Sequence, residues 1–442
     1  MNERLEKLVS DESVRLVARL AGELGAGAWL AGGCVRDALA GRRSRDLDFV
    51  LSEGCPELPR RFAERWGGAF FWLDEVRLQG RVVKQSAAGL LVRDFAPLRG
   101  AAIEEDLRLR DFTINALALP VAGGGVIDPT GGCADLDGRV IRGCGDHAFA
   151  DDPLRLLRAI RFAAELGFIV EPETWSAILR KSDLLEAVAA ERIRDEFFRI
   201  IALPGVGTSF QLLGEAGLLR HILPAGLRRL SSGRYSDNHR GLEARIGHAG
   251  SVEAVCCEAG QLVPDREETL AEYLATETES GIPHLSLMKL AAFLGGTDRG
   301  NVEALAGKLR LGRRTERLLG LLCGDLSELP AQYAGRRVLF RFFRDREPAG
   351  PGLVIVARAN GTISCSEALL LLRYYLEEYN PAADDLFLSG RDVMALLGIG
   401  EGEAVGEALA ALREAEGRGL VSDREEAAAF VKNLLTSEAP MR

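Results

Sequence analysis

The chain has 442 residues, of which 47% are hydrophobic, and a formal net charge of −10. This size suits about three domains, and the acidic balance argues against a simple nucleic-acid coat protein. The apolar runs are shorter than the roughly 18 to 20 residues of a membrane span, the first 25 residues resemble an amphipathic helix and not a signal peptide, and the eight cysteines include no CxxC. We therefore expect a reduced, cytoplasmic protein with no membrane partner, and the oligomeric state stays open.

Between residues 28 and 119, short apolar runs alternate with glycine-rich turns, which predicts a small sheet with helices. A turn-rich connector follows at residues 126–143. Beyond it, apolar residues recur every three or four positions, as in an all-helical region. The predicted fold class is α+β: a head with a small mixed sheet, followed by an elongated all-α part.

Two aspartates interrupt an apolar run in the head, at Asp46 and Asp48. Residues two apart in a strand share a face, so the two carboxylates project together, while Leu47, Phe49 and Leu51 point into the core. Buried carboxylates need neutralisation. Paired carboxylates at this spacing suit Mg²⁺, which takes a few carboxylates together with phosphate oxygens of a substrate.

A second feature lies about thirteen residues earlier. Gly32 and Gly33 allow a close approach of the backbone and open a predicted helix, whose amides attract phosphate. Arg36, one turn into this helix, can add charge-assisted bonds to a triphosphate. Taken together, a phosphate-binding turn, an arginine and a metal pair indicate nucleotidyl transfer, in which a hydroxyl attacks an α-phosphate and pyrophosphate leaves.

The segment "GGCVRDALAGRRSRDLDFV" resembles the class II tRNA nucleotidyltransferase and bacterial poly(A) polymerase family, which has a polymerase-beta-like head. The motifs "LRLRDFTINALAL", "DPTGGCADLDGRVIR", "DDPLRLLRAIRFAAELGF" and "ERIRDEFFRII" continue the resemblance in family order over about 200 residues. It implies that Gly32, Gly33 and Arg36 bind the incoming nucleotide and that Asp46 and Asp48 are catalytic and bind the metals. It also implies that Arg110 contacts phosphate and that Asp111 lies near the ribose. Leu109 stands where the family often has a first arginine, which puts any contact of that arginine in doubt.

The stretch "DDPLRLLRAIRF" places Asp152, Arg155, Arg158 and Arg161 at steps of three, along one face of a predicted helix. Cytosine and adenine both offer an amino donor beside a ring-nitrogen acceptor, so a fixed aspartate and arginine would select them over uracil and guanine. By resemblance, this motif selects the base without a nucleic-acid template, and CTP, ATP or both are the expected substrates. The alternative interpretation is a salt-bridged amphipathic helix.

The remaining helical part carries two basic segments, from which we predict contacts with RNA phosphates. The predicted RNA-binding residues are Lys308, Arg310, Arg313, Arg314, Arg336, Arg337 and Arg341. Phe340, Phe342 and Phe343 lie among the last of these, and we expect them in the core. Residues 284–322 resemble the metal-dependent HD phosphohydrolase domain of some relatives, but the ligand pair would fall near residues 294–296, where no metal ligand remains. We expect either a non-hydrolytic remnant or a generic helical region.

The leading hypothesis is a Mg²⁺-dependent, template-independent enzyme that adds C and A to the 3′ end of tRNA. The predicted domains are a head (1–140), a neck (141–205), a degenerate HD-like body (206–330) and a tRNA-binding tail (331–442). The alternatives are addition of A only, addition of C only, poly(A) synthesis, tRNA binding without catalysis, and nucleotidylation of a small molecule. By resemblance, a switch from C to A needs a movable segment of the head, and residues 70–108 are the candidate.

Overall fold

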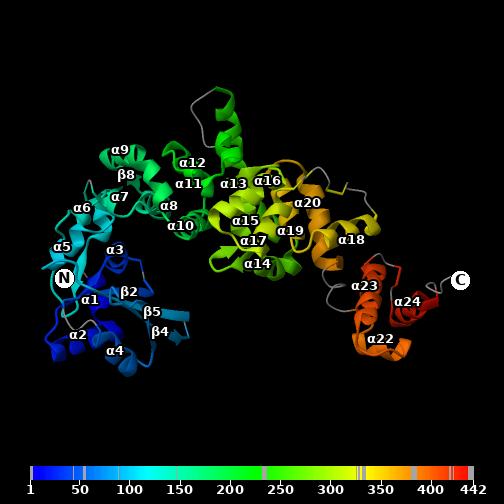
Figure 1. The fold of residues 1–442 in the computed structure, drawn as a ribbon, viewed down its shortest axis with the longest axis horizontal. Helices are drawn as coiled ribbons and strands as arrows, with labels where there is room; N and C mark the ends of the chain where they lie inside the picture. Colours follow the sequence, from blue (N-terminus) through cyan, green and yellow to red (C-terminus); the bar gives the residue numbers. More distant parts are fainter. Residues whose placement is uncertain are drawn as a thin grey trace. The chain divides into compact units, whose positions relative to one another are not determined.

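The computed structural model describes residues 3–436 except 43, 53–55, 88, 146, 231–235, 325, 327–328, 331–334, 380–385, 418–419 and 422. The chain divides into two compact units, residues 1–189 and residues 190–442 (Figure 1). The predicted neck, residues 141–205, is therefore shared between the units, because its last helix belongs to the second. The finer division into four domains stays a prediction.

The described residues of the first unit form a sheet of six strands in the order β3-β4-β5-β2-β1-β6. Strands β2 and β5 are parallel and the other neighbours antiparallel, which confirms the predicted mixed sheet of an α+β head. The strands are β1 (Ala28–Ala31), β2 (Asp46–Leu51), β3 (Ala69–Asp74), β4 (Gln79–Ser86), β5 (Gly89–Pro97) and β6 (Ala118–Pro120).

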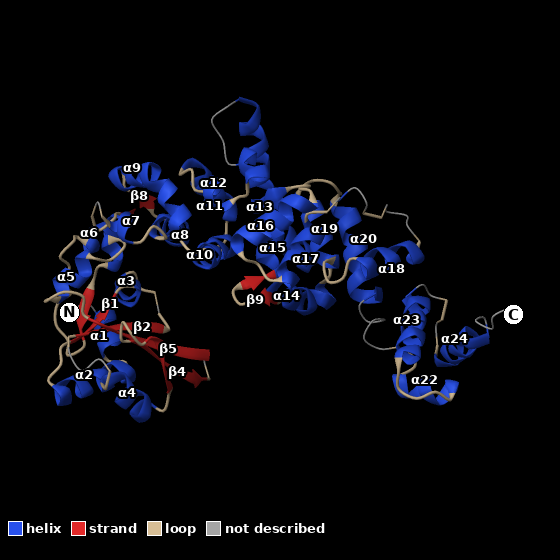
Figure 2. Ribbon diagram, in the orientation of Figure 1, coloured by secondary structure: helices blue, strands red, loops and turns tan. Residues whose placement is uncertain are grey.

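One face of this sheet is covered by three helices (Figure 2). Their shared core includes Leu47, Phe49 and Leu51 of β2, each at most 3% exposed, as the alternation predicts. Burial of these side chains leaves the alternate positions of β2, Asp46 and Asp48, for the opposite face. The three helices are α1 (Glu3–Val9), α2 (Glu12–Leu24) and α4 (Leu58–Trp66).

The region expected to be a movable segment, residues 70–108, is for most of its length a β-meander, and its movement stays a prediction. Strands β3, β4 and β5 occupy residues 69–97 and pair with one another in continuous register apart from an irregularity near the end of β3. The β3–β4 turn spans only residues 75–78, and the β4–β5 turn closes with Ser86 opposite Gly89. Backbone pairing to β2 through β5 ties this region to the strand that carries the two aspartates.

The rest of the first unit consists of short elements that connect the strands of the sheet or follow them. They are α3 (Gly33–Leu39), α5 (Ile103–Arg108), η1 (Thr113–Asn115), α6 (Gly132–Gly138), β7 (Val140–Ile141), α7 (Ala148–Asp151), α8 (Arg155–Leu166), β8 (Ile169–Val170), α9 (Pro172–Lys181) and η2 (Ser182–Ala187). Helix α8 is amphipathic, and its apolar side, including Leu156, Leu157 and Ile160, is fully buried.

The second unit is helical, with a single small hairpin among its described residues. Its elements are α10 (Ala190–Ala202), α11 (Val206–Glu215), α12 (Leu219–Ile222), η3 (Ala225–Leu230), α13 (Ser236–Leu262), η4 (Pro264–Arg266), α14 (Glu267–Ala275), β9 (Glu277–Glu279), β10 (Ile282–Pro283), α15 (His284–Leu294), α16 (Arg299–Leu309), α17 (Arg313–Leu322), α18 (Arg336–Asp345), α19 (Gly350–Ala359), α20 (Cys365–Arg373), the π-helical turn η6 (Tyr374–Tyr379), α22 (Gly390–Leu397), α23 (Glu403–Gly417) and α24 (Arg424–Thr436).

Helix α18 confirms the expectation that its aromatic side chains are core. Phe340, Phe342 and Phe343 are at most 7% exposed. Phe343 packs against the rings of Tyr374 and Tyr375. The last three helices, α22, α23 and α24, share a separate small core. None of the described helices combines the length and the apolar character that crossing a membrane requires.

Candidate active site

The two aspartates of the strand motif lie on the face of the sheet opposite the three covering helices. Asp46 is exposed and Asp48 partly buried, at the start of β2. A third carboxylate, Asp94, lies directly beside Asp48 on the parallel strand β5. Arg81 of β4 donates to both Asp94 oxygens, from Nε and Nη2, each at 2.7 Å. Asp94 was not among the predicted site residues, although "LLVRDFAPL" carries the same signal as the first motif, an acid inside an apolar strand.

The electrostatics of this cluster suit a cation. Burial, together with the charges of Asp94 and Asp46, raises the pKa of Asp48 to about 6, and the opposing charge of Arg110 is too small to cancel the effect. Oxygen donors with excess negative charge are the ligands that Mg²⁺ takes in proteins. Across the described part of the chain, no group of three or more His, Cys, Asp or Glu side chains has the arrangement of a metal centre. Since Arg81 engages Asp94, Asp46 and Asp48 remain as the candidate ligands.

The glycine turn lies against this cluster. Gly32 has φ +85°, a conformation that only glycine adopts without strain. A Cβ at this position would stand 2.8 Å from Nη1 of Arg110 and 3.8 Å from Oδ2 of Asp48. Gly32 therefore brings the start of α3 next to a carboxylate and a guanidinium, both predicted site groups. A Cβ at Gly33 would meet only Nη2 of Arg36, at 3.7 Å.

A buried chain of hydrogen bonds joins α3 to α8. Arg36 is 6% exposed and donates from Nη1 to Oδ1 of Asn115 at 2.7 Å. Asn115 in turn donates to Oδ1 of Asp111 at 3.1 Å. Arg158 donates to Oδ2 of Asp111 from Nε at 2.9 Å and from Nη2 at 2.6 Å. Burial alone would raise the pKa of Asp111, but the charge and hydrogen bonds of Arg158 hold it below its usual value.

The ring of Phe162 is the apolar centre of the same region. Three guanidinium groups lie over it, those of Arg36 and Arg158 at 5.2 Å and that of Arg161 at 4.2 Å from its centroid. Arg161 also bonds to Glu165 one turn on, at 2.5 Å. Asn115 and Phe162 were not among the predicted site residues, because what distinguishes them is contact with residues remote in the chain.

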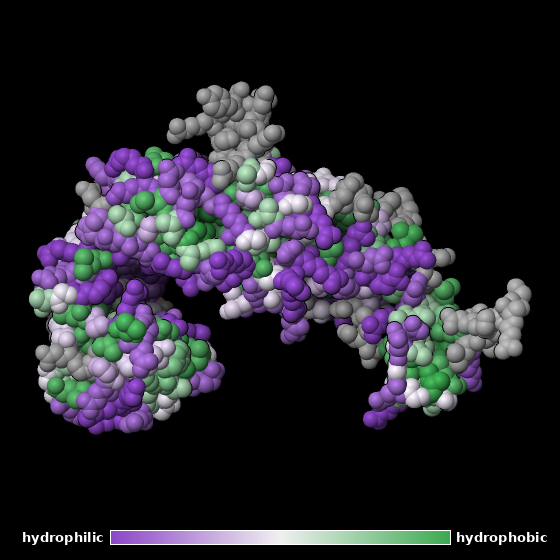
Figure 3. Space-filling model, in the orientation of Figure 1, coloured by the Kyte–Doolittle hydropathy of each residue, from purple (hydrophilic) through white to green (hydrophobic). Residues whose placement is uncertain are grey.

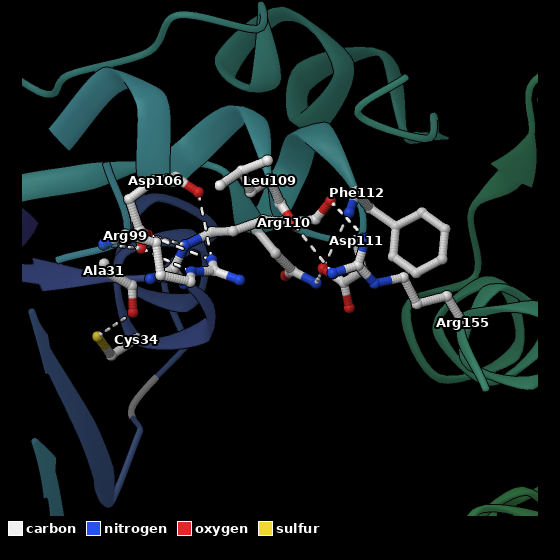
Figure 4. Close-up of polar contacts among 10 residues, drawn as sticks. Ala31, Cys34, Arg99, Asp106, Leu109, Arg110, Asp111, Phe112 and Arg155 are labelled. Atoms are coloured by element: carbon white, nitrogen blue, oxygen red, sulfur yellow. Dashed lines mark hydrogen bonds and ion pairs between the residues drawn. The ribbon is translucent and has the colours of Figure 1, made fainter. Parts of the chain in front are cut away.

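The polar contacts around residue 110 connect the head to the helices that follow (Figure 4). Arg110 bonds through Nε to Asp106 at 3.2 Å, and Arg99 bonds to the same carboxylate. Arg155 donates to three backbone carbonyls, those of Leu109 at 2.9 Å, Arg110 at 3.2 Å and Ala148 at 3.1 Å. In this structure Arg155 therefore anchors the loop that presents Arg110.

The base-selecting motif does not lie on one continuous helix as expected. Helix α7 ends at Asp151 and α8 begins at Arg155, and Asp152 between them has an extended backbone. Oδ1 of Asp152 accepts from the N–H of Leu154 at 3.3 Å, the bond pattern of a helix-initiating aspartate. The proline at position 153 explains the break, because the residue before a proline disfavours the helical conformation. Base selection by Asp152 and Arg155 stays a prediction.

The predicted RNA-binding residues differ in their surroundings. Arg313 and Arg314 are exposed at the start of α17. The others that can be described have protein contacts: Lys308 with the carbonyl of Leu223 at 3.0 Å, Arg310 with Glu191 at 2.6 Å, Arg336 with Glu378 at 2.8 Å, and Arg341 with Glu414 at 4.0 Å. The side chain of Arg337 lies outside the described residues. RNA binding by this set stays a prediction.

The place expected for a degenerate HD metal site holds a guanidinium. Arg245 of α13 donates from Nη1 to carbonyls at the end of α15, those of Phe293 at 3.2 Å, Leu294, and Gly295 at 3.3 Å. Gly295 and Gly296 both have positive φ and end the helix. A fixed cation here disfavours a divalent metal ion at the same place.

Comparisons with known proteins agree with this geometry. Residues 28–142 match the poly A polymerase head domain family, and residues 167–228 match the family described as the probable RNA and SrmB-binding site of polymerase A. The chain is 39% identical to a CC-adding tRNA nucleotidyltransferase of Geobacter sulfurreducens, over 100% of both chains. It is 35% identical to an A-adding tRNA nucleotidyltransferase of Deinococcus radiodurans, over 92% of this chain and 95% of that one.

Among solved structures, a CCA-adding enzyme of Bacillus stearothermophilus in complex with CTP has a TM-score of 0.64, with 23% identity over 99% of both chains. This likeness shows that the fold is shared. The full-length identity to the Geobacter relative shows the family, and it agrees with the resemblance carried by the sequence motifs. The chain belongs to the tRNA nucleotidyltransferase family, whose members generally use a divalent metal.

Proposed function

We propose that this enzyme adds C residues, and no A, to the 3′ end of tRNA, with CTP as the nucleotide, Mg²⁺ as the cofactor and pyrophosphate as the second product. The observation that carries the proposal is the folded state of residues 69–97. These residues form three paired strands joined by short turns. The full-length similarity to a CC-adding relative points the same way.

The number of conformations that the site can adopt limits the nucleotides it can add. A single site that accepts C twice and then A must change between steps as the RNA grows. The segment that could supply this change is held here by backbone hydrogen bonds to its neighbours in the sheet, and β5 is bonded to the catalytic strand β2. Moving it would break the ladder. A site that stays in one state accepts one kind of base, either C or A. The full-length similarity to a CC-adding relative favours C.

The side chains have distinct tasks in this reaction. Asp46 and Asp48 would hold the metal, which when bound neutralises triphosphate charge and increases the acidity of the attacking hydroxyl. Gly32 leaves room for the triphosphate beside Asp48 and Arg110. Arg110 is placed by Asp106 to meet phosphate oxygens. The hydrogen bonds that lead from Arg36 through Asn115 and Asp111 to Arg158 fix α3 and α8 relative to each other.

The proposal is tested with three tRNA substrates that end before the first C, after the first C and after the second C. Each is offered CTP and ATP separately, with Mg²⁺, and products are resolved at single-nucleotide resolution. We expect the first to gain two C residues, the second to gain one, and the third to gain neither C nor A. Addition of A to the third tRNA would refute C-only specificity. If the first two take no C, the A-adding activity named for the Deinococcus relative becomes the better proposal.

A further inference from the structure

The catalytic face of the sheet continues, across two further strands, to an exposed aromatic side chain. Asp48 on β2 lies opposite Asp94 on β5, Asp94 opposite Arg81 on β4, and Arg81 opposite Phe71 on β3. Residues opposite one another in neighbouring strands project to the same face. Phe71 therefore lies on the face of the catalytic carboxylates, at the edge strand of the sheet.

Phe71 is not part of the hydrophobic core of the head. Its neighbours Phe70 and Trp72 project to the other face, where both rings receive the guanidinium of Arg60 from α4. Phe71 is 42% exposed, and none of the described aromatic rings stacks on it. Exposure of a large ring costs free energy that burial would recover. Figure 3 shows apolar side chains, in green, at the surface of this unit.

On the same face of the sheet, the neighbouring row of cross-strand residues includes two apolar side chains. Val92 of β5 lies opposite Asp46, and Val83 of β4 lies opposite Val92. Both valines are only partly buried. On the side away from the glycine turn, the carboxylates are therefore adjacent to a surface that consists of Phe71, Val83 and Val92 around the guanidinium of Arg81. We call these four residues the β3–β5 surface.

The strand order decides what this surface can bind. Gly32 follows β1, which flanks β2 on one side, so the incoming nucleotide occupies that side. The β3–β5 surface flanks β2 on the other side. The attacking hydroxyl must reach the α-phosphate from the side that the nucleotide leaves open. We propose that the β3–β5 surface binds the single-stranded 3′ end of the RNA, with a base stacked on Phe71. This inference rests on the proposed function.

Dimensions and charge fit this occupant. Three strand spacings of about 4.8 Å separate Asp48 from Phe71, about 14 Å in all. This length corresponds to roughly four stacked nucleotides at 3.4 Å each. Aromatic rings accept bases of any identity by stacking, as an enzyme that serves many tRNAs requires. The Arg81 side chain keeps 36% of its surface exposed while its Nε and Nη2 bond to Asp94, so its remaining nitrogen can meet a backbone phosphate.

The test compares Phe71→Ala with Phe71→Trp in the full-length enzyme. The substrate is an RNA minihelix whose 3′ strand lacks the terminal C residues and ends in five unpaired nucleotides, with 2-aminopurine four nucleotides before the last position. Loss of one stacked base should raise the KM for the minihelix about 5- to 140-fold in Phe71→Ala. The KM for CTP should stay within about twofold, since CTP binds on the other side of β2. Phe71→Trp should retain a KM near that of the wild type.

Two readouts separate stacking from a structural effect. Fluorescence of the bound 2-aminopurine should be quenched in the wild type and in Phe71→Trp, and should brighten in Phe71→Ala. Val76→Ala, which truncates a 94% exposed residue in the β3–β4 turn, is the matched control and should change neither quantity. An unchanged minihelix KM in Phe71→Ala, or equal effects on RNA and CTP, would overturn the proposal.

Sedimentation of the enzyme without RNA tests whether a second copy of the chain covers the β3–β5 surface instead. A wild-type dimer that Phe71→Ala dissociates would mean that a second copy of the chain covers the surface, and the RNA proposal would be wrong. If the wild type adds no C to the minihelix, the proposed function fails. If 2-aminopurine fluorescence is not quenched in the wild type, the proposal that a base stacks on Phe71 is refuted, whatever nucleotide the enzyme adds.

Discussion

Removal of Arg158 should destabilise the first unit by about 2–3 kcal/mol. Breaking a fully buried ion pair by deleting one partner costs about 3–5 kcal/mol. Here the Asp111 side chain is 10% exposed and that of Arg158 29% exposed, so solvent reduces the cost. In Arg158→Ala, Asp111 would keep the N–H of Phe112 at 2.9 Å and the amide of Asn115 at 3.1 Å, but would lose its two charge-assisted bonds.

The assay is urea unfolding at pH 7 with a probe in the first unit, such as a label near α8. The matched control is Arg65→Ala, because Arg65 and Glu23 also form a two-point pair in this unit, at 2.8 and 3.0 Å. That pair is 39–44% exposed, so solvent screens it and its loss should cost much less than the loss of Arg158. The double variant Asp111→Asn with Arg158→Ala should recover part of the loss, since no buried charge remains.

The pH dependence gives a second check. In the wild type the folded-state pKa of Asp111 is lowered, so its contribution to stability is present above the unfolded-state pKa, about 3.9, and is lost as pH falls through the folded-state pKa. In Arg158→Ala, burial without the arginine should raise the folded-state pKa of Asp111, and stability should then fall as pH rises. The cost of the substitution should therefore be smaller at pH 4 than at pH 7. A cost no greater than that of Arg65→Ala, or one independent of pH, would refute the reasoning.

Three further predictions concern catalysis. Asp46→Ala or Asp48→Ala should abolish nucleotide incorporation while tRNA affinity, measured by filter binding, stays nearly unchanged, since phosphate contacts dominate that affinity; near-normal activity in either variant would remove the metal assignment. Gly32→Ala should raise the KM for CTP at least about tenfold, because the new Cβ displaces Arg110 and strains a backbone at φ +85°, whereas Gly33→Ala should be milder; equal effects of the two changes would contradict this. The second unit should hydrolyse no phosphodiester, even with Mn²⁺ or Ni²⁺, because Arg245 occupies the expected metal position, and turnover that depends on His284 or His248 would overturn this.

The sequence alone determined the features that depend on local pattern. Alternation predicted that Leu47, Phe49 and Leu51 are buried and that Asp46 and Asp48 share the opposite face, because side-chain direction in a strand repeats every two residues. The periodicity beyond the head predicted helices, and the basic helix α18 was expected to bury its phenylalanines. The motifs also sufficed to recognise the family, because their spacing along the chain is itself the signal.

Only the tertiary structure decided the contacts between residues far apart in the chain. Asp94 becomes a neighbour of Asp48 through the parallel pairing of β2 and β5. The two aspartates are 46 residues apart in the chain (94 − 48), and the register of such strands cannot be read from either strand alone. The same pairing places residues 69–97, most of the segment expected to move, in the sheet, and that pairing depends on strands remote in the chain. Asn115 and Phe162 acquire roles only because α3, η1 and α8 meet around them. Phe71 is exposed on the edge strand β3, on the face that carries Asp46 and Asp48.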